Sequence, residues 1–408
     1  MGAKDTGSTT RRSFLSLAAA GSAVALAGCS GGGGSGGNTA TLGSLNPMSG
    51  SYSSLGPNQR AGVELAVEQV NNGDEFDYGF ETVYKDTATE AGTAQQVAQQ
   101  AVQQDDADFL MGAISSSVAL SLNEFAASEE VVYFSGGAAV PITGSACNEW
   151  VYRFETNTAQ IAEAISDYTV NELGSNVWFH IADYAYGDSV YQRTRQRMSE
   201  ESDAFTEVGQ TASELGSSNF GSYISQISNS DADSVILGML GGDLVSFVNQ
   251  AANRGLTEEV NIVAPTMSIQ STRQALGQQG VGTYGGVRYN ANIDIGDNAQ
   301  FVEAFREAND GRLPDNFERT GYESVRYLAA GMQEAESTDP ADVRDALEGM
   351  TRTTVLGDVT LREEDHQATV PTWMAEMVPG EGETAEVELL SRTDDNLPPA
   401  SELGCEMN

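Results

Sequence analysis

From residue 39 onward, short apolar runs alternate with longer segments in which apolar residues recur at helical spacing. The segment 57–71, for example, carries Ala61, Leu65 and Val70 at that spacing. Repeated strand–helix alternation predicts a parallel sheet with helices on both of its faces. The first run predicts strands at 39–45, 80–85, 108–111 and 131–134, and helices at 57–71, 91–104 and 118–128.

A second run with the same alternation begins near residue 160. It predicts helices at 160–172, 189–200, 220–228 and 243–254, and strands at 176–181, 206–210, 234–238 and 261–264. Two such runs indicate two doubly wound α/β lobes, and a helix at 321–336 is expected to return to the first. We therefore expect residues 39–156 and 287–350 to form lobe 1, and residues 157–286 and 351–408, with the C-terminal tail, to form lobe 2.

The N-terminus has the pattern of an export signal. Arg11 and Arg12 precede a short apolar stretch at 14–27, which is shorter than the roughly 20 apolar residues that a membrane helix needs. Residues 10–15 resemble a twin-arginine signal, and Leu26-Ala27-Gly28-Cys29 resembles a lipobox. We expect residues 1–28 to be removed, Cys29 to be lipidated and residues 29–38 to form a Gly/Ser tether, so that the protein is exported and anchored to the outer face of the membrane. The alternative is an ordinary cleaved signal with a chance cysteine.

The chain is strongly acidic. It has 59 acidic against 20 basic residues, a formal net charge of −39. This balance excludes nucleic-acid binding and charge-driven docking on anionic lipid, both of which need a basic surface. Disorder would also explain a high charge, but 40% of the residues are hydrophobic and regularly patterned. The composition resembles that of proteins secreted by extreme halophiles, in which molar salt shortens the Debye length to about 3 Å.

The cysteines and histidines suggest neither a metal site nor a catalytic site. Besides Cys29, only Cys147 and Cys405 remain, and in an oxidising compartment we expect them to form a disulfide that pins the tail to lobe 1; two free thiols are the alternative. His180 lies in an apolar strand and is interpreted as a core residue, whereas His366 follows three acidic residues and is interpreted as solvated. No metal-ligand spacing, nucleophile elbow or phosphate-binding loop occurs, so we expect no metal, no cofactor and no enzymatic activity.

Ligands of open α/β sheets bind beyond the carboxyl ends of the strands. That rule selects the loops 45–56, 111–117 and 135–139 in lobe 1, and 183–187, the turn after Leu240 and 265–267 in lobe 2. At the second loop a strand ends and a helix begins with Ser115, Ser116 and Ser117, and a helix N-terminus binds carboxylates well. The alternative for Ser116 or Ser117 is that it caps its own helix.

These loops carry a family resemblance. Met48-Ser49-Gly50, Leu55-Gly56, Met111-Gly112 with Ser116-Ser117, Val132-Tyr133-Phe134-Ser135 and Tyr186-Gly187 resemble, in order and spacing, the solute-binding proteins of branched-chain amino acid (leucine/isoleucine/valine) ABC transporters. The resemblance covers nearly the whole chain after the tether. It implies a type I periplasmic-binding fold with two lobes, three crossover segments and a ligand cleft. It also implies a monomer that delivers a small solute to ABC permease subunits in the membrane.

Some family positions are kept and others differ. The resemblance places the carboxylate-binding serine at Ser116, a binding-loop backbone at Gly137 and a cleft aromatic residue at Tyr184 or Tyr186. The glutamate that meets a ligand ammonium is replaced by Thr266. Three further binding positions are replaced by Leu55, Ala139 and Leu240. The expected ligand-binding set is therefore Leu55, Ser115, Ser116, Ser117, Gly137, Ala138, Ala139, Tyr184, Tyr186, Leu240 and Thr266.

The missing glutamate bears on the solute. A buried ammonium without a charge partner is costly by several kcal/mol, which argues against a zwitterionic amino acid. The hydroxyls suit a carboxylate or an amide, and Cys147 with the tail around Cys405 resembles a branch of the family whose ligands include aromatic and other organic acids. We therefore expect an amino acid, an amide, or an organic or aromatic carboxylate. The alternatives are a sensory receptor of the same fold and an exported enzyme.

Overall fold

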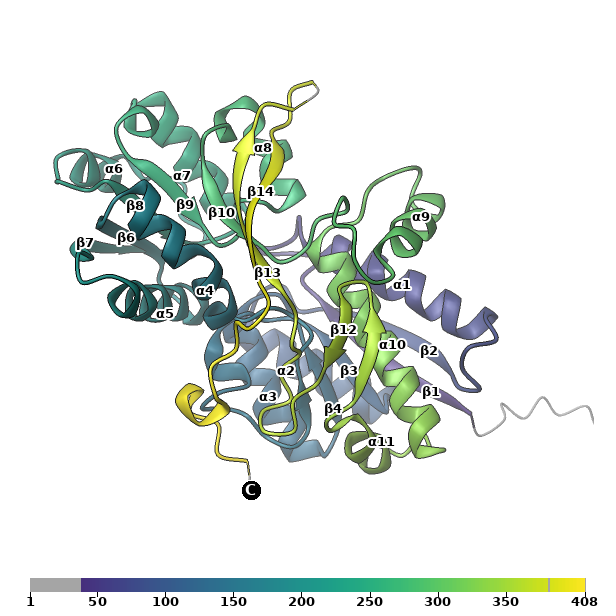
Figure 1. The fold of residues 1–408 in the computed structure, drawn as a ribbon. Helices are drawn as coiled ribbons and strands as arrows, with labels where there is room; N and C mark the ends of the chain where they lie inside the picture. Colours follow the sequence, from purple (N-terminus) through teal and green to yellow (C-terminus); the bar gives the residue numbers. More distant parts are fainter. Residues whose placement is uncertain (1–37, 381, 408) are drawn as a thin grey trace, which may run out of the picture. The chain divides into compact units, whose positions relative to one another are not determined.

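The computed structural model describes residues 38–380 and 382–407 (Figure 1). The predicted signal, the lipidation site Cys29 and nearly all of the tether lie outside these residues. Within the described part of the chain, no helix has the length and apolar character needed to cross a membrane.

Lobe 1 is built on a parallel five-stranded sheet with the strand order β2-β1-β3-β4-β5. Helices α1 and α10 pack against each other, and α2 packs against α3. Close approach of α1 and α10 depends on glycine, because a Cβ at Gly62 would lie 1.9 Å from the Glu318 carbonyl oxygen. The strands are β1 (Thr39–Asn46), β2 (Gly79–Asp86), β3 (Phe109–Gly112), β4 (Val132–Ser135) and β5 (Val151–Tyr152), and the helices are α1 (Gly56–Asn72), α2 (Ala91–Gln104), α3 (Ser116–Glu129), α9 (Asn298–Ala308), α10 (Asn316–Ala335) and α11 (Pro340–Leu347).

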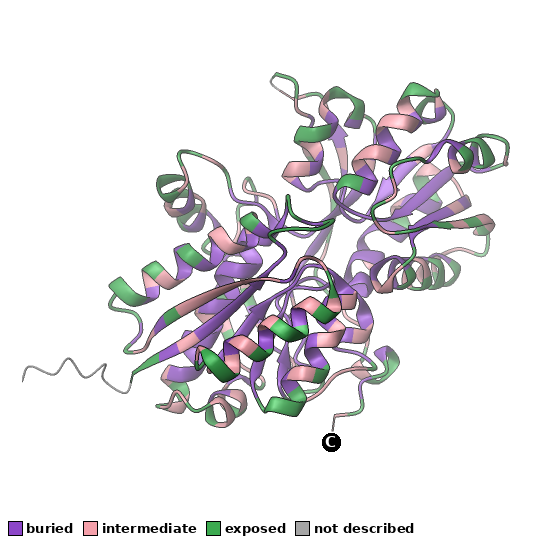
Figure 2. Ribbon diagram, turned by 180° about the vertical axis from the view of Figure 1, so that it is seen from behind, coloured by how far each residue is buried: buried purple, intermediate pink, exposed green. Residues whose placement is uncertain are grey.

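Lobe 2 is built on a seven-stranded sheet with the order β14-β13-β10-β9-β8-β6-β7. The five strands from β10 to β7 are parallel, and β13 and β14 add an antiparallel edge. The strands are β6 (Asn176–Ala182), β7 (Thr206–Ser213), β8 (Ser234–Gly238), β9 (Asn261–Ala264), β10 (Tyr284–Val287), β13 (Thr372–Val378) and β14 (Glu386–Thr393), and the helices are α4 (Thr158–Tyr168), α5 (Ala185–Glu201), α6 (Gly221–Ser228), α7 (Gly242–Asn253) and α8 (Gln270–Leu276). Figure 2 shows the central strands of both sheets buried and the outer helix faces exposed.

The predicted two-lobed α/β architecture is confirmed, with one boundary corrected. A hairpin of β11 (Thr351–Thr354) and β12 (Gly357–Thr360) lies against α10 of lobe 1 (Figure 1). The Val355 N–H donates to the Glu323 carboxylate at 2.7 Å, and the Tyr327 hydroxyl donates to the Val359 carbonyl at 2.6 Å. The return to lobe 2 therefore begins near β13, about 20 residues later than the sequence pattern suggested at residue 351.

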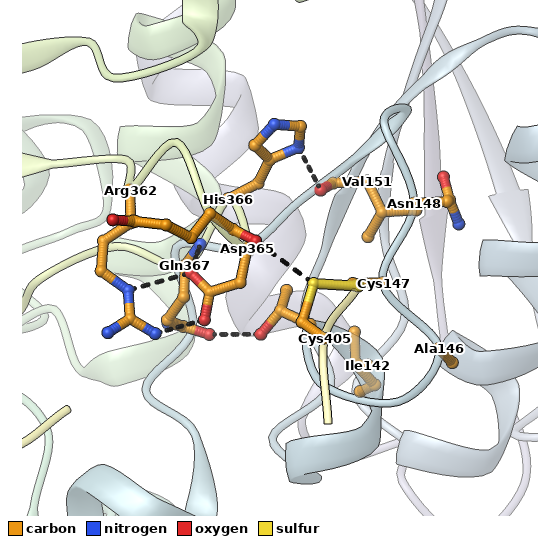
Figure 3. Close-up of a disulfide and its surroundings, with 12 residues drawn as sticks. Ile142, Ala146, Cys147, Asn148, Val151, Arg362, Asp365, His366, Gln367 and Cys405 are labelled. Atoms are coloured by element: carbon orange, nitrogen blue, oxygen red, sulfur yellow. Dashed lines mark hydrogen bonds and ion pairs between the residues drawn. A yellow bond between two sulfur atoms is a disulfide. The ribbon is translucent and has the colours of Figure 1, made fainter. Parts of the chain in front are cut away.

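A disulfide joins Cys147 to Cys405, which lie 258 residues apart in the chain (Figure 3). It fastens the C-terminal tail beside the segment that leads from the hairpin back to lobe 2. There the Cys405 sulfur lies 3.3 Å from the Glu364 carbonyl oxygen, and Asp365 pairs with Arg362. A crosslink that closes so long a loop stabilises a protein mainly by restricting its unfolded chain.

Both histidines are buried, so the interpretation of His366 as a solvated side chain is wrong. The His366 ring stacks on Tyr152 with ring centroids 4.0 Å apart. Its Nδ1 lies 3.1 Å from the Val151 carbonyl oxygen (Figure 3). The prediction relied on the three acidic residues that precede His366 in the sequence. The ring is buried instead, because the segment that returns to lobe 2 packs it against Tyr152. Burial lowers the pKa of His366 to about 4.

His180 is a core residue of β6, as predicted. Its ring packs against Phe220, Tyr223 and Phe247, and its Nδ1 bonds to the Thr211 hydroxyl at 2.8 Å. Burial lowers its pKa to about 4 from the ordinary value of 6.5. The unfolded chain therefore binds a proton at a higher pH than the folded chain does, and this contribution to stability, complete above pH 6.5, is lost as the pH falls toward 4.

We predict that His180→Phe makes the free energy of unfolding fall less steeply as the pH is lowered from 6.5 to 4. Phenylalanine fills the same aromatic pocket and does not titrate, so the variant should lose about 1 kcal/mol less per pH unit than the wild type between pH 6.5 and 4. Urea unfolding at half-unit pH intervals measures the difference, and the two curves should run parallel above pH 7. Equal slopes on the acid limb would contradict the assignment.

Candidate ligand-binding site

The loop after β1 lies on the side of lobe 1 that contacts lobe 2. Its backbone is fixed by Asp86 at the end of β2, whose carboxylate accepts from the N–H groups of Met48 and Ser49 at 2.9 and 3.2 Å. The Thr89 hydroxyl accepts from the Tyr52 N–H at 3.2 Å. These bonds hold Tyr52 and Leu55 in place, and each of these two side chains is 1% exposed.

The second loop leads from β3 into the N-terminus of α3. Ala113 has a φ of +58°, a strained conformation of the kind that clusters at binding sites. No side chain caps the helix at Ser115. The buried Ser116 hydroxyl accepts from the Ala139 N–H at 3.1 Å, so it does not cap its own helix, and its hydrogen remains available for an acceptor. Ser117 follows in the first turn and is half-buried.

The third loop, which follows β4, is fastened to the first crossover. Nη1 of Arg153 donates to the carbonyl oxygens of Gly137 and Ala139 at 3.2 and 2.5 Å, and the Thr158 N–H donates to the Ala138 carbonyl at 2.9 Å. The carbonyl groups of Gly137 and Ala139 are therefore turned toward Arg153 in the interior. Ala138 is packed with residues of both lobes.

The lobe 2 residues lie at the carboxyl ends of β6, β8 and β9. Tyr184 and Tyr186 flank the start of α5, with ring centroids 6.0 Å apart. Leu240 is buried after β8. The Thr266 hydroxyl donates to the Met239 carbonyl at 2.8 Å. The position that the family resemblance gives to a glutamate therefore holds an uncharged side chain in this protein. Burial raises the pKa of both tyrosines, so their hydroxyls stay protonated and uncharged.

The two lobes meet at these loops. The hydroxyls of Tyr52 and Tyr184 bond to each other at 2.5 Å. A Cβ placed on Gly241 of lobe 2 would lie 3.6 Å from the Tyr52 ring and 3.9 Å from the Leu55 side chain. One buried cluster is shared by both lobes and contains Tyr52, Leu55, Ile114, Ala138, Tyr186, Leu240, Ile269 and Phe317. The predicted wall residues are therefore brought together, with Ser116 and Thr266 buried beside them.

Sequence reasoning missed several members of this site. Tyr52 stands in the loop that the strand-end rule selected, but the family position was given to Leu55. Ile269 lies two residues beyond the selected loop 265–267, and Phe317 lies just before the start predicted for the helix 321–336. Arg288 comes directly after β10, a four-residue strand with two glycines that has no clear strand pattern. Had β10 been recognised, the same rule would have selected Arg288.

Buried polar groups connect the crossovers behind the cleft. Arg153 and Gln367 form a parallel bridge between the first and third crossovers, and the Arg153 Nε donates to the Gln367 side chain at 2.5 Å. The second crossover joins them through Arg288, whose Nη1 lies 3.3 Å from the Glu155 carboxylate. Glu155 also accepts from Asn316 at 2.7 Å. Among the described residues, no group of three or more His, Cys, Asp or Glu side chains is arranged to hold a metal ion.

The chain belongs to the periplasmic binding protein family, whose sequence pattern matches residues 39–383. It is 23% identical over 386 residues to a Leu/Ile/Val-binding protein homolog of Brucella abortus, covering 89% of each chain. Its fold is similar to that of an amino acid ABC transporter substrate-binding protein from Pseudomonas fluorescens, with a TM-score of 0.81, 24% identity, and 90% and 99% of the two chains covered. It is also similar to a solute-binding protein of Rhodopseudomonas palustris solved with 3,4-dihydroxybenzoic acid, with a TM-score of 0.80, 18% identity, and 89% and 99% covered.

We predict that Tyr52 and Tyr184 are energetically coupled across the cleft. Tyr52→Phe and Tyr184→Phe each remove one side of the same hydroxyl bond and should each cost about 0.5–1.5 kcal/mol of stability. The double variant should cost little more than either single variant, as a double-mutant cycle from urea unfolding would show. Tyr191→Phe is the matched control, because the Tyr191 hydroxyl bonds to Glu207 within lobe 2. The destabilisation by Tyr191→Phe should add to that by Tyr52→Phe. Additive effects of Tyr52→Phe and Tyr184→Phe would contradict the bond between the two hydroxyls.

Proposed function

We propose that this protein is the solute-binding component of an ABC importer and captures a small organic solute between its lobes. The observation that supports this most is the contact between strand-end loops of the two lobes, in which Tyr52 and Leu55 of lobe 1 join a buried cluster with Tyr186 and Leu240 of lobe 2. Such a site suits capture by closure. One lobe binds the solute, and bending at the crossovers brings the second lobe over it.

The site has an apolar wall and one polar end. The side chains of Leu55, Ile114 and Leu240 can contact the carbon skeleton of a solute, and the tyrosine rings can stack on an aromatic one. The free N–H groups at the start of α3, together with the Ser116 hydroxyl, suit the oxygen atoms of a carboxylate or an amide. Rhodopseudomonas palustris relatives solved with 3,4-dihydroxybenzoic acid and with benzoate agree with this class of solute.

An ammonium group lacks its usual family partner in this site. Thr266 stands where the family resemblance expects a glutamate. Of the nearby carboxylates, Glu155 accepts from Asn316 and Arg288, and one oxygen of Asp243 accepts from the Gly216 N–H at 2.9 Å. We therefore favour a carboxylate or an amide over a zwitterionic amino acid, although a Brucella ovis protein of similar fold is a leucine-, isoleucine-, valine-, threonine- and alanine-binding protein.

The proposal extends to location and partners. The protein would be exported as a monomer by a twin-arginine signal. Lipidation at Cys29 and a glycine-rich tether would then hold it on the outer face of the cell membrane, where the permease subunits of the importer receive the solute. The acidic composition suits work in concentrated salt, which screens the self-repulsion of the chain. No chemical step is assigned to the protein, because its task is to bind and release.

We predict a ligand-dependent thermal shift that requires Ser116. Residues 39–408 in molar potassium chloride would be screened against benzoates, aliphatic carboxylates, their amides, and leucine and valine. A solute at 100 times its Kd adds about 2.7 kcal/mol of stability. Ser116→Ala should lose most of that shift. Ser121→Ala on the same helix should keep it, because the Ser121 hydroxyl donates only to the Val118 carbonyl. A dominant response to leucine or valine would contradict the proposed solute class.

A further inference from the structure

Arg288 is a buried cation at the cleft side of lobe 2. It follows β10, which runs parallel to β9, so it emerges at the same sheet edge as Thr266 and the other binding loops. Its side chain is 4% exposed. Nη2 donates to the hydroxyl of Tyr186 at 3.2 Å, and Tyr186 belongs to the buried cluster that both lobes share.

The hydrogen-bonding capacity of Arg288 is only partly used. A guanidinium has five N–H donors, whereas Arg288 makes two bonds, both longer than the usual 2.7–2.9 Å of a charge-assisted bond. Its Nε is buried and has no partner. A buried polar group without a partner is costly. The free donors of Arg288 are therefore explained if they serve a further hydrogen-bond acceptor, such as a bound solute.

The charge around Arg288 is also incompletely balanced. Glu155 interacts electrostatically with three guanidinium groups, those of Arg153, Arg288 and Arg319. Its second oxygen accepts from Asn316 and Thr320. The other carboxylates near these arginines have partners of their own. Asp365 pairs with Arg362, and Glu323, which accepts from the Val355 N–H, acts on Arg319, so that Glu155 and Glu323 together face the three arginines. In a chain with a net charge of −39, the back of this cleft therefore carries excess positive charge.

We propose that Arg288 is a specificity-determining residue that makes the site select an ionised carboxylate over the neutral amide of the same acid. This inference rests on the proposed function and narrows it. Helix N–H groups and the Ser116 hydroxyl bind the oxygen of either solute, whereas a full positive charge in a closed cleft favours the anion alone. The charge acts directly on the solute or through the Tyr186 hydroxyl, which Arg288 orients by donating to its oxygen.

The test is the ratio of affinities for a carboxylate and its amide. Calorimetry with benzoate against benzamide, and with isovalerate against isovaleramide, would be run at pH 7 on the wild type and on Arg288→Gln. The wild type should prefer each carboxylate, and Arg288→Gln should lower that preference about tenfold or more, a change of about 1.4 kcal/mol. Arg288→Lys keeps the charge and should retain part of the preference, and Tyr186→Phe should lower it to a smaller degree.

Arg273→Gln is the matched control. It removes the same charge and two hydrogen bonds, from Arg273 to the Ser268 and Ala385 carbonyls, but Arg273 does not contact Tyr186. Its carboxylate preference should equal that of the wild type. A purely structural role of Arg288 predicts that both affinities fall together with an unchanged ratio, which would overturn this inference alone. If the wild type binds the amides but no carboxylate, this inference alone falls, and if it binds neither kind of solute, the proposed solute class falls with it.

Discussion

The structure depends on a set of buried polar bonds that fasten three chain crossings to one another. Arg153 is fully buried, and its guanidinium reaches two loop carbonyls of lobe 1 and the side chain of Gln367 on the third crossover. Glu155, two residues further on, holds Arg288 of the second crossover. Each of these side chains is costly to bury alone, and the bonds among them offset part of that cost. The same residues that join the crossovers therefore lie next to the loops of the candidate site, as the bond from Arg288 to the Tyr186 hydroxyl shows.

This arrangement would allow a very acidic chain to build the proposed site for a carboxylate. The surface charge lies on exposed helix faces, where salt screens it, whereas the arginines at the crossovers lie in a low-dielectric interior where screening is weak. Glu155 and Glu323 together cannot neutralise three guanidinium groups, and the excess charge lies behind Tyr186. The global charge of the protein and the local charge of its cleft therefore have opposite signs.

Much of the fold was predictable from the sequence, because β-α alternation leaves few ways to pack. Strands such as β6 and helices such as α7 lie close to where apolar spacing placed them. The antiparallel strands β13 and β14 and the hairpin before them were not predictable in this way, since their burial depends on contacts with α10 and β10. The site followed the strand-end rule for Leu55, Ser116, Tyr186 and Leu240. Arg288 was not predicted, because the two glycines of β10 obscure the strand pattern before it. The burial of His366 was not predicted, because acidic neighbours in sequence do not determine whether a side chain is buried.

The most direct test of this account is a crystal structure of residues 39–408 with the carboxylate that gives the largest thermal shift. We expect the solute between Tyr52 of lobe 1 and Tyr184 of lobe 2, with a carboxylate oxygen about 3 Å from the Ser116 hydroxyl and with the Arg288 guanidinium as its nearest full positive charge. A solute bound outside these loops, or an acidic side chain turned toward it, would contradict the account.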